Sequence, residues 1–138
     1  MTLLELINKI KVVAISQGEV NTIIENDIFI LNELADVNYG VFAYTQGEHT
    51  TRAASDSITY NFTFFWVGLL TDDRSNMNEL QSKAIEVLDR ILYTLYYNEC
   101  EITIGNYAFT PFNKRFEDEC AGCWVDVAIT TNKALNCK

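Results

Sequence analysis

The feature that most constrains this chain is the stretch over residues 57–70, where the side-chain pattern changes halfway along. Its first half has large apolar residues at every second position: Ile58, Tyr60, Phe62 and Phe64. The positions between them are polar: Thr59, Asn61 and Thr63. The second half is almost continuously apolar: Phe65, Trp66, Val67, Leu69 and Leu70. A period of two predicts a β-strand, and the loss of the polar side predicts that its second half is covered on both faces.

A strand that is covered on both faces needs a partner on each side of its sheet. One helix packed on the sheet can cover the first face. The second face then requires either more of this chain or another subunit, which favours a component of an assembly over an enzyme. From the residues alone we expect an α+β interaction module.

The composition limits the possible partners. A chain of 138 residues can bury a core as one domain, and its 49% of hydrophobic residues argues against disorder. The formal net charge is −9 and the pI is about 4.4. Binding the phosphates of nucleic acid or of an anionic membrane requires clustered Lys and Arg, but only Lys114 and Arg115 are adjacent. We therefore expect no binding to either surface.

The N-terminal residues 1–10 mix acidic and basic residues with apolar ones, so no signal peptide is expected. No window of the sequence reaches the ~18 apolar residues that a membrane span requires. We expect the protein to mature in the cytoplasm, where its four cysteines should be thiols and not disulfides.

Two helices are expected. Over residues 1–18, Thr2 can cap the start and Gly18 can end the helix. Apolar residues recur there at helical spacing: Leu3, Leu6, Ile7, Ile10, Val13 and Ala14. A longer helix over residues 76–97 has its own apolar stripe: Met77, Leu80, Ala84, Val87, Leu88, Ile91, Leu92 and Leu95. The longer helix should lie across a sheet and cover one of its faces.

Five strands are expected, over residues 37–45, 58–70, 101–104, 107–116 and 123–131. Pro111 marks its strand as an edge strand or a bulge, because proline cannot donate to a central ladder. Residues 19–36 fit either a helical turn or an extended arm. The order of elements predicts an α+β fold in a single domain over residues 1–138, with one long helix across an antiparallel sheet and a further N-terminal helix.

The polar segment over residues 46–56 separates two predicted strands. We expect it to form a long loop that projects from the sheet. Loops of this length are usually functional or mobile, so a functional loop and a disordered tip both stay open.

Few residues can carry chemistry. Cys120 and Cys123 form a single CxxC around an Ala-Gly turn between strands, where the sulfurs could face each other across a hairpin. Because a zinc site needs four ligands and no second pair matches, structural thiols are expected over a metal or redox site. His49, the only imidazole, is expected to be a solvated loop residue. The acidic residues 117–119 and 72–73 match no calcium loop, and we predict no catalytic, metal or cofactor site.

Aromatic residues gather near the end of the long predicted helix, where Tyr93, Tyr96 and Tyr97 follow one another closely. Trp66 and Trp124 lie in predicted strands. Core packing explains such residues, but aromatic side chains are also enriched at protein–protein interfaces. Which of these residues face a partner stays open.

The order of elements can be compared with known families. A helix leads to a strand around Tyr39-Gly40-Val41-Phe42, then to the polar loop, the apolar strand and the long helix. The chain closes with Glu101-Ile102-Thr103-Ile104, residues 112–116 and residues 124–129. This order resembles that of the tail-terminator and tail-completion proteins of tailed bacteriophages, and of the related neck ring proteins beneath the portal. It covers nearly the whole chain and rests on element order, not on a diagnostic motif. The Tyr-rich composition also looks like that of proteins from crAss-like phages.

The resemblance implies a structural virion protein of the neck or tail, made in the host cytoplasm, without catalysis or cofactor. Members of the family form rings of about six or twelve copies around the channel through which DNA leaves the capsid. Portal, neck and tail proteins would be the neighbours of such a ring, and no membrane would be involved. DNA would pass without specific binding, because acidic residues lining the channel would repel it.

In this family the long loop reaches a neighbouring ring or the tube, and residues 46–56 match that loop. The resemblance and the strand pattern together indicate seven interface residues: Gln46, Glu48, His49, Arg52, Phe65, Val67 and Leu69. The Cys120–Cys123 pair departs from the family. Two other hypotheses are a small cytosolic enzyme that uses Cys120 or Cys123, and a monomeric adaptor that binds one partner through its sheet edge.

Overall fold

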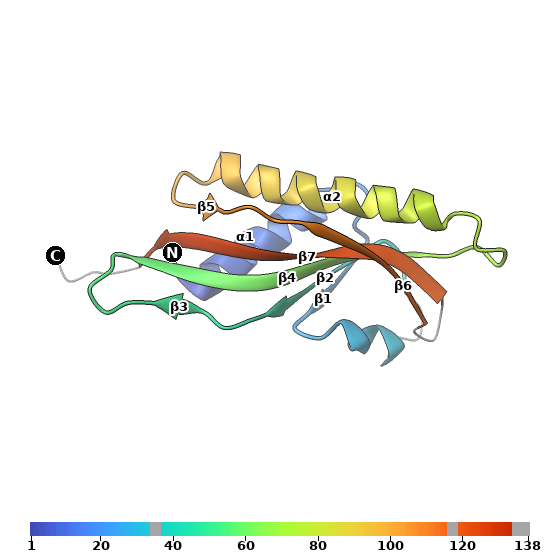
Figure 1. Cartoon of the computed structure of the whole chain (residues 1–138), viewed down its shortest axis with the longest axis horizontal. Helices are drawn as coiled ribbons and strands as arrows, with labels where there is room; N and C mark the ends of the chain where they lie inside the picture. Colours follow the sequence, from blue (N-terminus) through green and yellow to red (C-terminus); the bar gives the residue numbers. More distant parts are fainter. Residues whose placement is uncertain (34–36, 116–118, 134–138) are drawn as a thin grey trace.

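The computed structural model describes residues 1–33, 37–115 and 119–133, and it has the α+β architecture predicted from the sequence (Figure 1). Its helices are α1 (Leu3–Ile15), the short 3₁₀ helix η1 (Ile28–Glu33) and α2 (Met77–Asn98). Its strands are β1 (Thr22–Glu25), β2 (Val41–Gln46), β3 (Thr50–Thr51), β4 (Ser57–Leu69), β5 (Thr103–Ile104), β6 (Phe109–Arg115) and β7 (Glu119–Asn132). None of the helices in these ranges is long and apolar enough to cross a membrane.

The centre of the sheet is the antiparallel pair of β4 and β7, which runs from Ser57 opposite Asn132 to Leu69 opposite Cys120. The strand order is β1-β2-β4-β7-β5, and in addition β3 pairs with β4 and β6 pairs with β7. β1 and β2 are parallel, so the sheet is mixed and the prediction of a purely antiparallel sheet is wrong. The connection between β1 and β2 contains η1 and carries the chain back to the end of the sheet at which β1 begins. The strand β2 can therefore run in the same direction as β1.

The main core lies on one face of the sheet, beneath both helices. The buried side of α2 consists of residues from the predicted stripe: Ala84, Val87, Leu88, Ile91, Leu92 and Leu95. These residues share a core with the apolar side of β4: Tyr60, Phe62, Phe64 and Trp66. Removing this apolar surface from water stabilises the fold by roughly 25 cal/mol per Å².

The second face of the sheet is covered at only one end. There Ile28 and Leu31 of η1 belong to a smaller buried cluster with Val41, Val67 and Phe112. The prediction that the second half of β4 is covered on both faces is confirmed around Trp66 and Val67 but is wrong for Leu69, which is 46% exposed. The cover is provided by this chain, however, so burial of β4 does not by itself require another subunit.

Most element boundaries agree with the sequence pattern. Thr2 caps α1, because its Oγ1 accepts a hydrogen bond from the Glu5 amide at 3.2 Å, as predicted. α1 ends at Ile15, earlier than the predicted stop at Gly18. Residues 19–33 contain both β1 and η1, so the extended and helical alternatives each describe part of this segment. Among the described strands β6 pairs with β7 alone, which confirms that Pro111 lies in an edge strand.

Part of the polar segment over residues 46–56 belongs to the sheet. Thr50 and Thr51 form β3, which pairs with Thr59 and Ile58 of β4. β2 and β3 therefore pair in succession with one long strand. The prediction of a loop that projects from the sheet is wrong for β3. The strand β4 is longer than β2, and its unpaired backbone groups form hydrogen bonds with β3.

Candidate functional site

The seven predicted interface residues lie towards opposite ends of β4. Four belong to the connection that runs from β2 into β4: Gln46, Glu48, His49 and Arg52. The other three belong to the end of β4 that η1 covers: Phe65, Val67 and Leu69. They therefore do not form one continuous surface.

His49 is fixed by its neighbours, so the prediction of a solvated loop histidine is wrong. Its Nδ1 accepts a hydrogen bond from the Asn61 amide at 3.1 Å, and its Nε2 lies 3.0 Å from Gln46 Oε1. With Nδ1 as acceptor, Nε2 carries the proton and donates to the amide oxygen. The ring also stands edge-on to Tyr60, with the centroids 5.3 Å apart. Both ring nitrogens are engaged, so this imidazole fastens the connection between β2 and β4.

The other three predicted interface residues between β2 and β4 also contribute to local structure. Gln46 Nε2 donates to Asn26 Oδ1 at 2.9 Å, which connects the end of β2 to the turn after β1. The backbone carbonyl of Glu48 accepts a hydrogen bond from Asn61 Nδ2 at 2.6 Å. Arg52 is exposed, and its carbonyl accepts from Lys133 Nζ at 2.8 Å. These contacts leave the side chains of Glu48 and Arg52 on the surface.

At the covered end the three predicted residues differ in exposure. Val67 is 0% exposed, because its side chain packs in the η1 cluster, so it offers no surface to a partner. Phe65 is half-buried beside the same cluster. Leu69 is 46% exposed. Of these three, Leu69 presents the most surface.

The two cysteines of the CxxC lie on opposite faces of the sheet. Both belong to β7, and they are not separated by a turn, contrary to the sequence interpretation. Cys120 packs in the η1 cluster, whereas Cys123 packs beneath the helices, because positions three apart in a strand point to opposite sides. Both are fully buried, and burial raises the pKa of the Cys123 thiol to about 12. This placement prevents the two sulfurs from sharing a metal ion or a disulfide, and burial disfavours the thiolate form of Cys123.

The acidic residues of these clusters make local contacts where the structure describes them. Within the described ranges no group of three His, Cys, Asp or Glu residues could hold a metal ion. Asp73 Oδ1 accepts from Thr71 Oγ1 at 2.8 Å and from the Ser75 amide at 3.1 Å, so it closes the turn before α2. These hydrogen bonds lower the pKa of Asp73. Glu119 lies 3.7 Å from Arg74, and residues 117 and 118 of the predicted acidic group lie outside the described residues.

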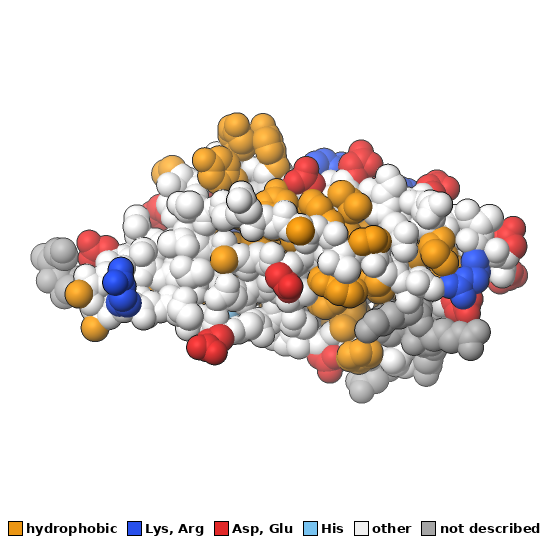
Figure 2. Space-filling model, in the orientation of Figure 1, with side chains coloured by type: hydrophobic (Ala, Val, Ile, Leu, Met, Phe, Trp, Pro, Cys, Tyr) orange, Lys and Arg blue, Asp and Glu red, His pale blue; other side chains and the backbone are white. Residues whose placement is uncertain are grey.

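The part of the second sheet face that η1 does not cover is polar, and its side chains form hydrogen bonds with one another. Thr63 donates to Asp126 Oδ1 at 2.6 Å, and the hydroxyls of Thr59 and Thr130 lie 2.8 Å apart. A shallow hollow of about 330 Å³ lies beside Asn61 and Asp126. In Figure 2 this part of the surface is mostly uncoloured, whereas hydrophobic side chains gather nearer η1 and β6. Hydroxyl, amide and carboxylate groups dominate this part of the surface.

The outer side of the helices is more apolar than the open face of the sheet. Seven of the nine exposed large hydrophobic residues in the described chain lie on α1 or α2: Leu4, Val12, Ile15, Ile85, Tyr93, Tyr96 and Tyr97. Leu4, Val12 and Ile15 share one side of α1 and are 68%, 67% and 55% exposed. We call this set the α1 stripe.

Sequence reasoning missed the α1 stripe, although a signal was present. Nine of the 13 residues of α1 are apolar, which exceeds what a single core-facing stripe requires. A helix that is apolar on more than one side is normally buried on more than one side. The buried side of α1, with Leu6, Ile7, Ile10 and Ala14, accounts for only part of these residues.

The three tyrosines at the end of α2 form a second exposed cluster, which we call the tyrosine ridge. Tyr93, Tyr96 and Tyr97 are 59%, 51% and 65% exposed. The rings of Tyr93 and Tyr97 lie 4.4 Å apart between centroids, and Tyr96 stands edge-on to Tyr97 at 5.6 Å. A hydrogen bond with Tyr97 raises the pKa of Tyr93. Trp66, by contrast, is 3% exposed, so the structure separates core aromatics from surface aromatics.

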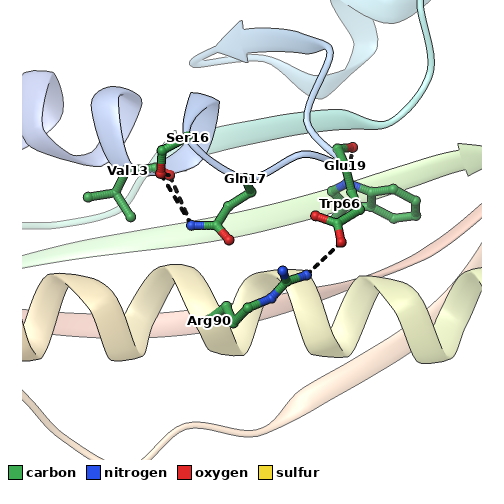
Figure 3. A network of polar contacts seen from close by, with 6 residues as sticks. All are labelled: Val13, Ser16, Gln17, Glu19, Trp66 and Arg90. Atoms are coloured by element: carbon green, nitrogen blue, oxygen red, sulfur yellow. Dashed lines mark hydrogen bonds and ion pairs between the residues drawn. The ribbon is translucent and has the colours of Figure 1, made fainter.

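A polar network holds the helices against the sheet (Figure 3). Arg90 Nη2 of α2 donates to Glu19 Oε1 at 2.9 Å, and the Trp66 indole donates to the Glu19 carbonyl at 3.2 Å. The ion pair with Arg90 lowers the pKa of Glu19. Glu19 Oε2 is buried without a hydrogen-bond partner among the described residues. The network joins the α1–β1 connection to α2 and β4 and has a structural role.

Comparison with known proteins does not assign the chain to a family. No protein-family model matches it, and a search of the curated proteins finds no match.

Proposed function

We propose that this chain is a structural subunit that assembles with copies of itself into a ring, as in the neck or tail of a tailed bacteriophage. The observation that carries the proposal is the α1 stripe. Leu4, Val12 and Ile15 stay more than half exposed on a helix whose other side is buried in the core. Apolar surface gathered on one element is typical of a binding surface, whereas single exposed apolar residues need no explanation.

A ring contact is heterologous, so each subunit needs two unlike surfaces that fit each other. The helical side of this chain is apolar and the open face of the sheet carries threonine, asparagine and aspartate, so the chain has two unlike surfaces. The α1 stripe requires an apolar counterpart on the neighbouring copy, because polar groups buried against it would lose their hydrogen bonds to water. The resemblance of the element order to tail-terminator and neck ring proteins supports a ring over an open filament. The formal charge of −9 suits a ring through which DNA passes without binding.

The competing hypotheses are less well supported. An enzyme based on Cys120 or Cys123 would need an accessible thiolate, and both thiols are buried. An adaptor that adds a strand at the β6 edge would meet Pro111, where one backbone donor is lacking, whereas the opposite edge at β1 has all its backbone donors.

Native mass spectrometry over a wide concentration range, with negative-stain imaging of the same sample, tests the proposal. The wild type is compared with the double variant Val12→Gln, Ile15→Gln, because glutamine preserves helix propensity. Phe29→Gln on η1 is the matched control, since Phe29 is as exposed as Ile15 at 55%. Circular dichroism establishes that each variant is folded.

We expect closed rings of about six or twelve copies for the wild type and for the control, and dissociated subunits for the α1 double variant. Rings that persist in the double variant would remove the α1 stripe from the interface. A wild type that stays monomeric at every concentration would overturn self-assembly and favour the single-partner adaptor.

A further inference from the structure

We propose that the tyrosine ridge binds a basic segment of a different protein that also carries an apolar side chain. The ridge lies at the C-terminal end of α2, and the hollow beside it is lined by no residue of the α1 stripe. This proposal does not rest on ring formation, because a single subunit already presents the whole ridge.

The aromatic rings supply the first part of the argument. Tyr93, Tyr96 and Tyr97 each leave more than half of their surface exposed, and Tyr97 contacts the rings of both other tyrosines. Exposed ring faces attract cations through the negative potential of the π system, and tyrosine loses little conformational entropy on binding. An arginine or lysine side chain is therefore a suitable partner for this surface.

A hollow beside the ridge supplies the second part. Its volume is about 200 Å³, and it is lined by Leu92, Tyr93, Tyr96, Ile104 and Tyr107. It lies between α2 and the β5–β6 segment. Aliphatic and aromatic carbon atoms form most of this lining, so the hollow suits an apolar side chain placed next to the cation.

The charges around the ridge supply the third part. Between residues 86 and 101 the chain has four acidic residues, Glu86, Asp89, Glu99 and Glu101, and one base, Arg90. Arg90 is paired with Glu19 at 2.9 Å. The nearby Lys9 is paired with Glu99 at 2.7 Å. The rim is therefore acidic overall, and at the hollow Asp89 Oδ1 accepts from Tyr107 Oη at 2.8 Å.

The same charges argue against a second copy as the occupant. Two ridges facing each other would bring their acidic rims together, and the whole chain has a formal charge of −9. Like charges placed opposite each other weaken association, whereas a basic segment gains from both the rim and the ring faces. Charge complementarity thus selects a basic partner.

Fluorescence anisotropy with labelled synthetic peptides of equal length tests the proposal on the full chain. One peptide combines arginine and leucine, a second combines arginine and serine, and a third combines glutamate and leucine. The variant Tyr93→Ala, Tyr97→Ala removes the ring faces. The matched control is Val12→Gln, Ile15→Gln, which alters exposed apolar residues of α1 outside the hollow. A further variant, Glu86→Gln, Asp89→Asn, lowers the acidity of the rim.

We expect saturable binding of the arginine–leucine peptide alone. Its affinity should fall about tenfold in the tyrosine variant and several-fold in the rim variant, and it should stay unchanged in the α1 control. Added salt should weaken it, because the rim contributes through charge. Unchanged thermal melting of the exposed-site variants establishes that the fold is intact.

Several results would overturn the proposal. Equal binding of the glutamate–leucine peptide would show that charge does not select the partner, and equal binding of the arginine–serine peptide would show that the hollow contributes nothing. An equal loss in the α1 control, or no binding of any peptide, would also contradict it. If the tyrosine variant instead changes the oligomeric state without peptide binding, the ridge is a contact between copies.

Discussion

The two ends of β4 differ in the environment of one face only. On the helical face both ends are buried, with Phe62 at 2% exposure and Trp66 at 3%. On the other face the first end presents Thr59 and Thr63 to solvent, whereas the second end places Val67 beneath η1. One strand thus belongs to a two-layer structure at one end and to a three-layer structure at the other.

This difference shows what a burial pattern can and cannot reveal. A strand without a polar side is expected to be covered on both faces, and residues 65–70 predict this correctly for Trp66 and Val67 but not for the exposed Leu69. The pattern does not reveal whether the cover belongs to the same chain. Here η1, only six residues long, replaces the second subunit that the pattern also allowed.

The strongest test of the covered end is Gly122→Ala in β7. A Cβ atom at this position would lie 1.8 Å from the carbonyl oxygen of Trp66, so the backbone of β4 or β7 would have to move. We expect a loss of about 3 kcal/mol or more in the free energy of unfolding, measured in urea.

Gly47→Ala is the matched control at the open end. There the nearest atom to a new Cβ is Asn61 Cβ at 3.5 Å, which is an ordinary contact. We expect a change within about 0.5 kcal/mol. Equal losses in both variants would show that the two ends are packed to the same tightness.

A milder comparison removes methyl groups from the second face. Val67→Ala should cost about 2 kcal/mol of unfolding free energy, because it deletes buried apolar volume and leaves a cavity beneath η1. Thr63→Ala removes a surface hydrogen bond to Asp126, so about 1 kcal/mol or less is expected. Urea unfolding of the pair measures both values. If Val67→Ala were the less costly of the two, η1 would not be packed on the sheet in solution.

The next comparison concerns the elements that cover the sheet, which are α1 and α2 on one face and η1 on the other. Cys123 lies beneath two helices, whereas Cys120 lies beneath η1, which contributes few buried residues. Local opening of a small element requires less free energy than opening of the main core. We expect Cys120 to react at least about tenfold faster than Cys123 with a thiol reagent under native conditions, with exposed Cys100 as the fast reference. Peptide mapping by mass spectrometry assigns each site, and equal rates would mean that both covers open together.

The sequence predicts periodic elements well and their partners less well. The α2 stripe, the alternation in β4 and the edge position of Pro111 all follow from side-chain chemistry that acts within a few residues. The parallel pairing of β1 and the pairing of β3 depend on contacts between distant segments. The opposite orientation of Cys120 and Cys123 follows from their spacing once both lie in β7, and β7 includes Cys120 because this residue pairs with β4 and β6. The excess of apolar residues in α1 could have indicated the α1 stripe from the sequence. Which of these residues are exposed depends on how α2 and the sheet pack against α1.

The smallest expected effect concerns Glu19, which secures the covered end through Trp66 and Arg90. The ion pair lowers the folded-state pKa of Glu19 below its ordinary value of 4.5, so the stabilisation is complete above about pH 4.5 and is lost as the pH falls through the folded-state pKa. Glu19→Gln should therefore lower stability at neutral pH by less than about 1 kcal/mol, because the pair is partly exposed to solvent. The difference between wild type and variant should shrink below pH 4.5.

Urea unfolding across this pH range, repeated in an Arg90→Gln background, isolates the contribution of the pair. A pH-dependent difference that survives in that background would mean that another group, and not Arg90, lowers the pKa of Glu19.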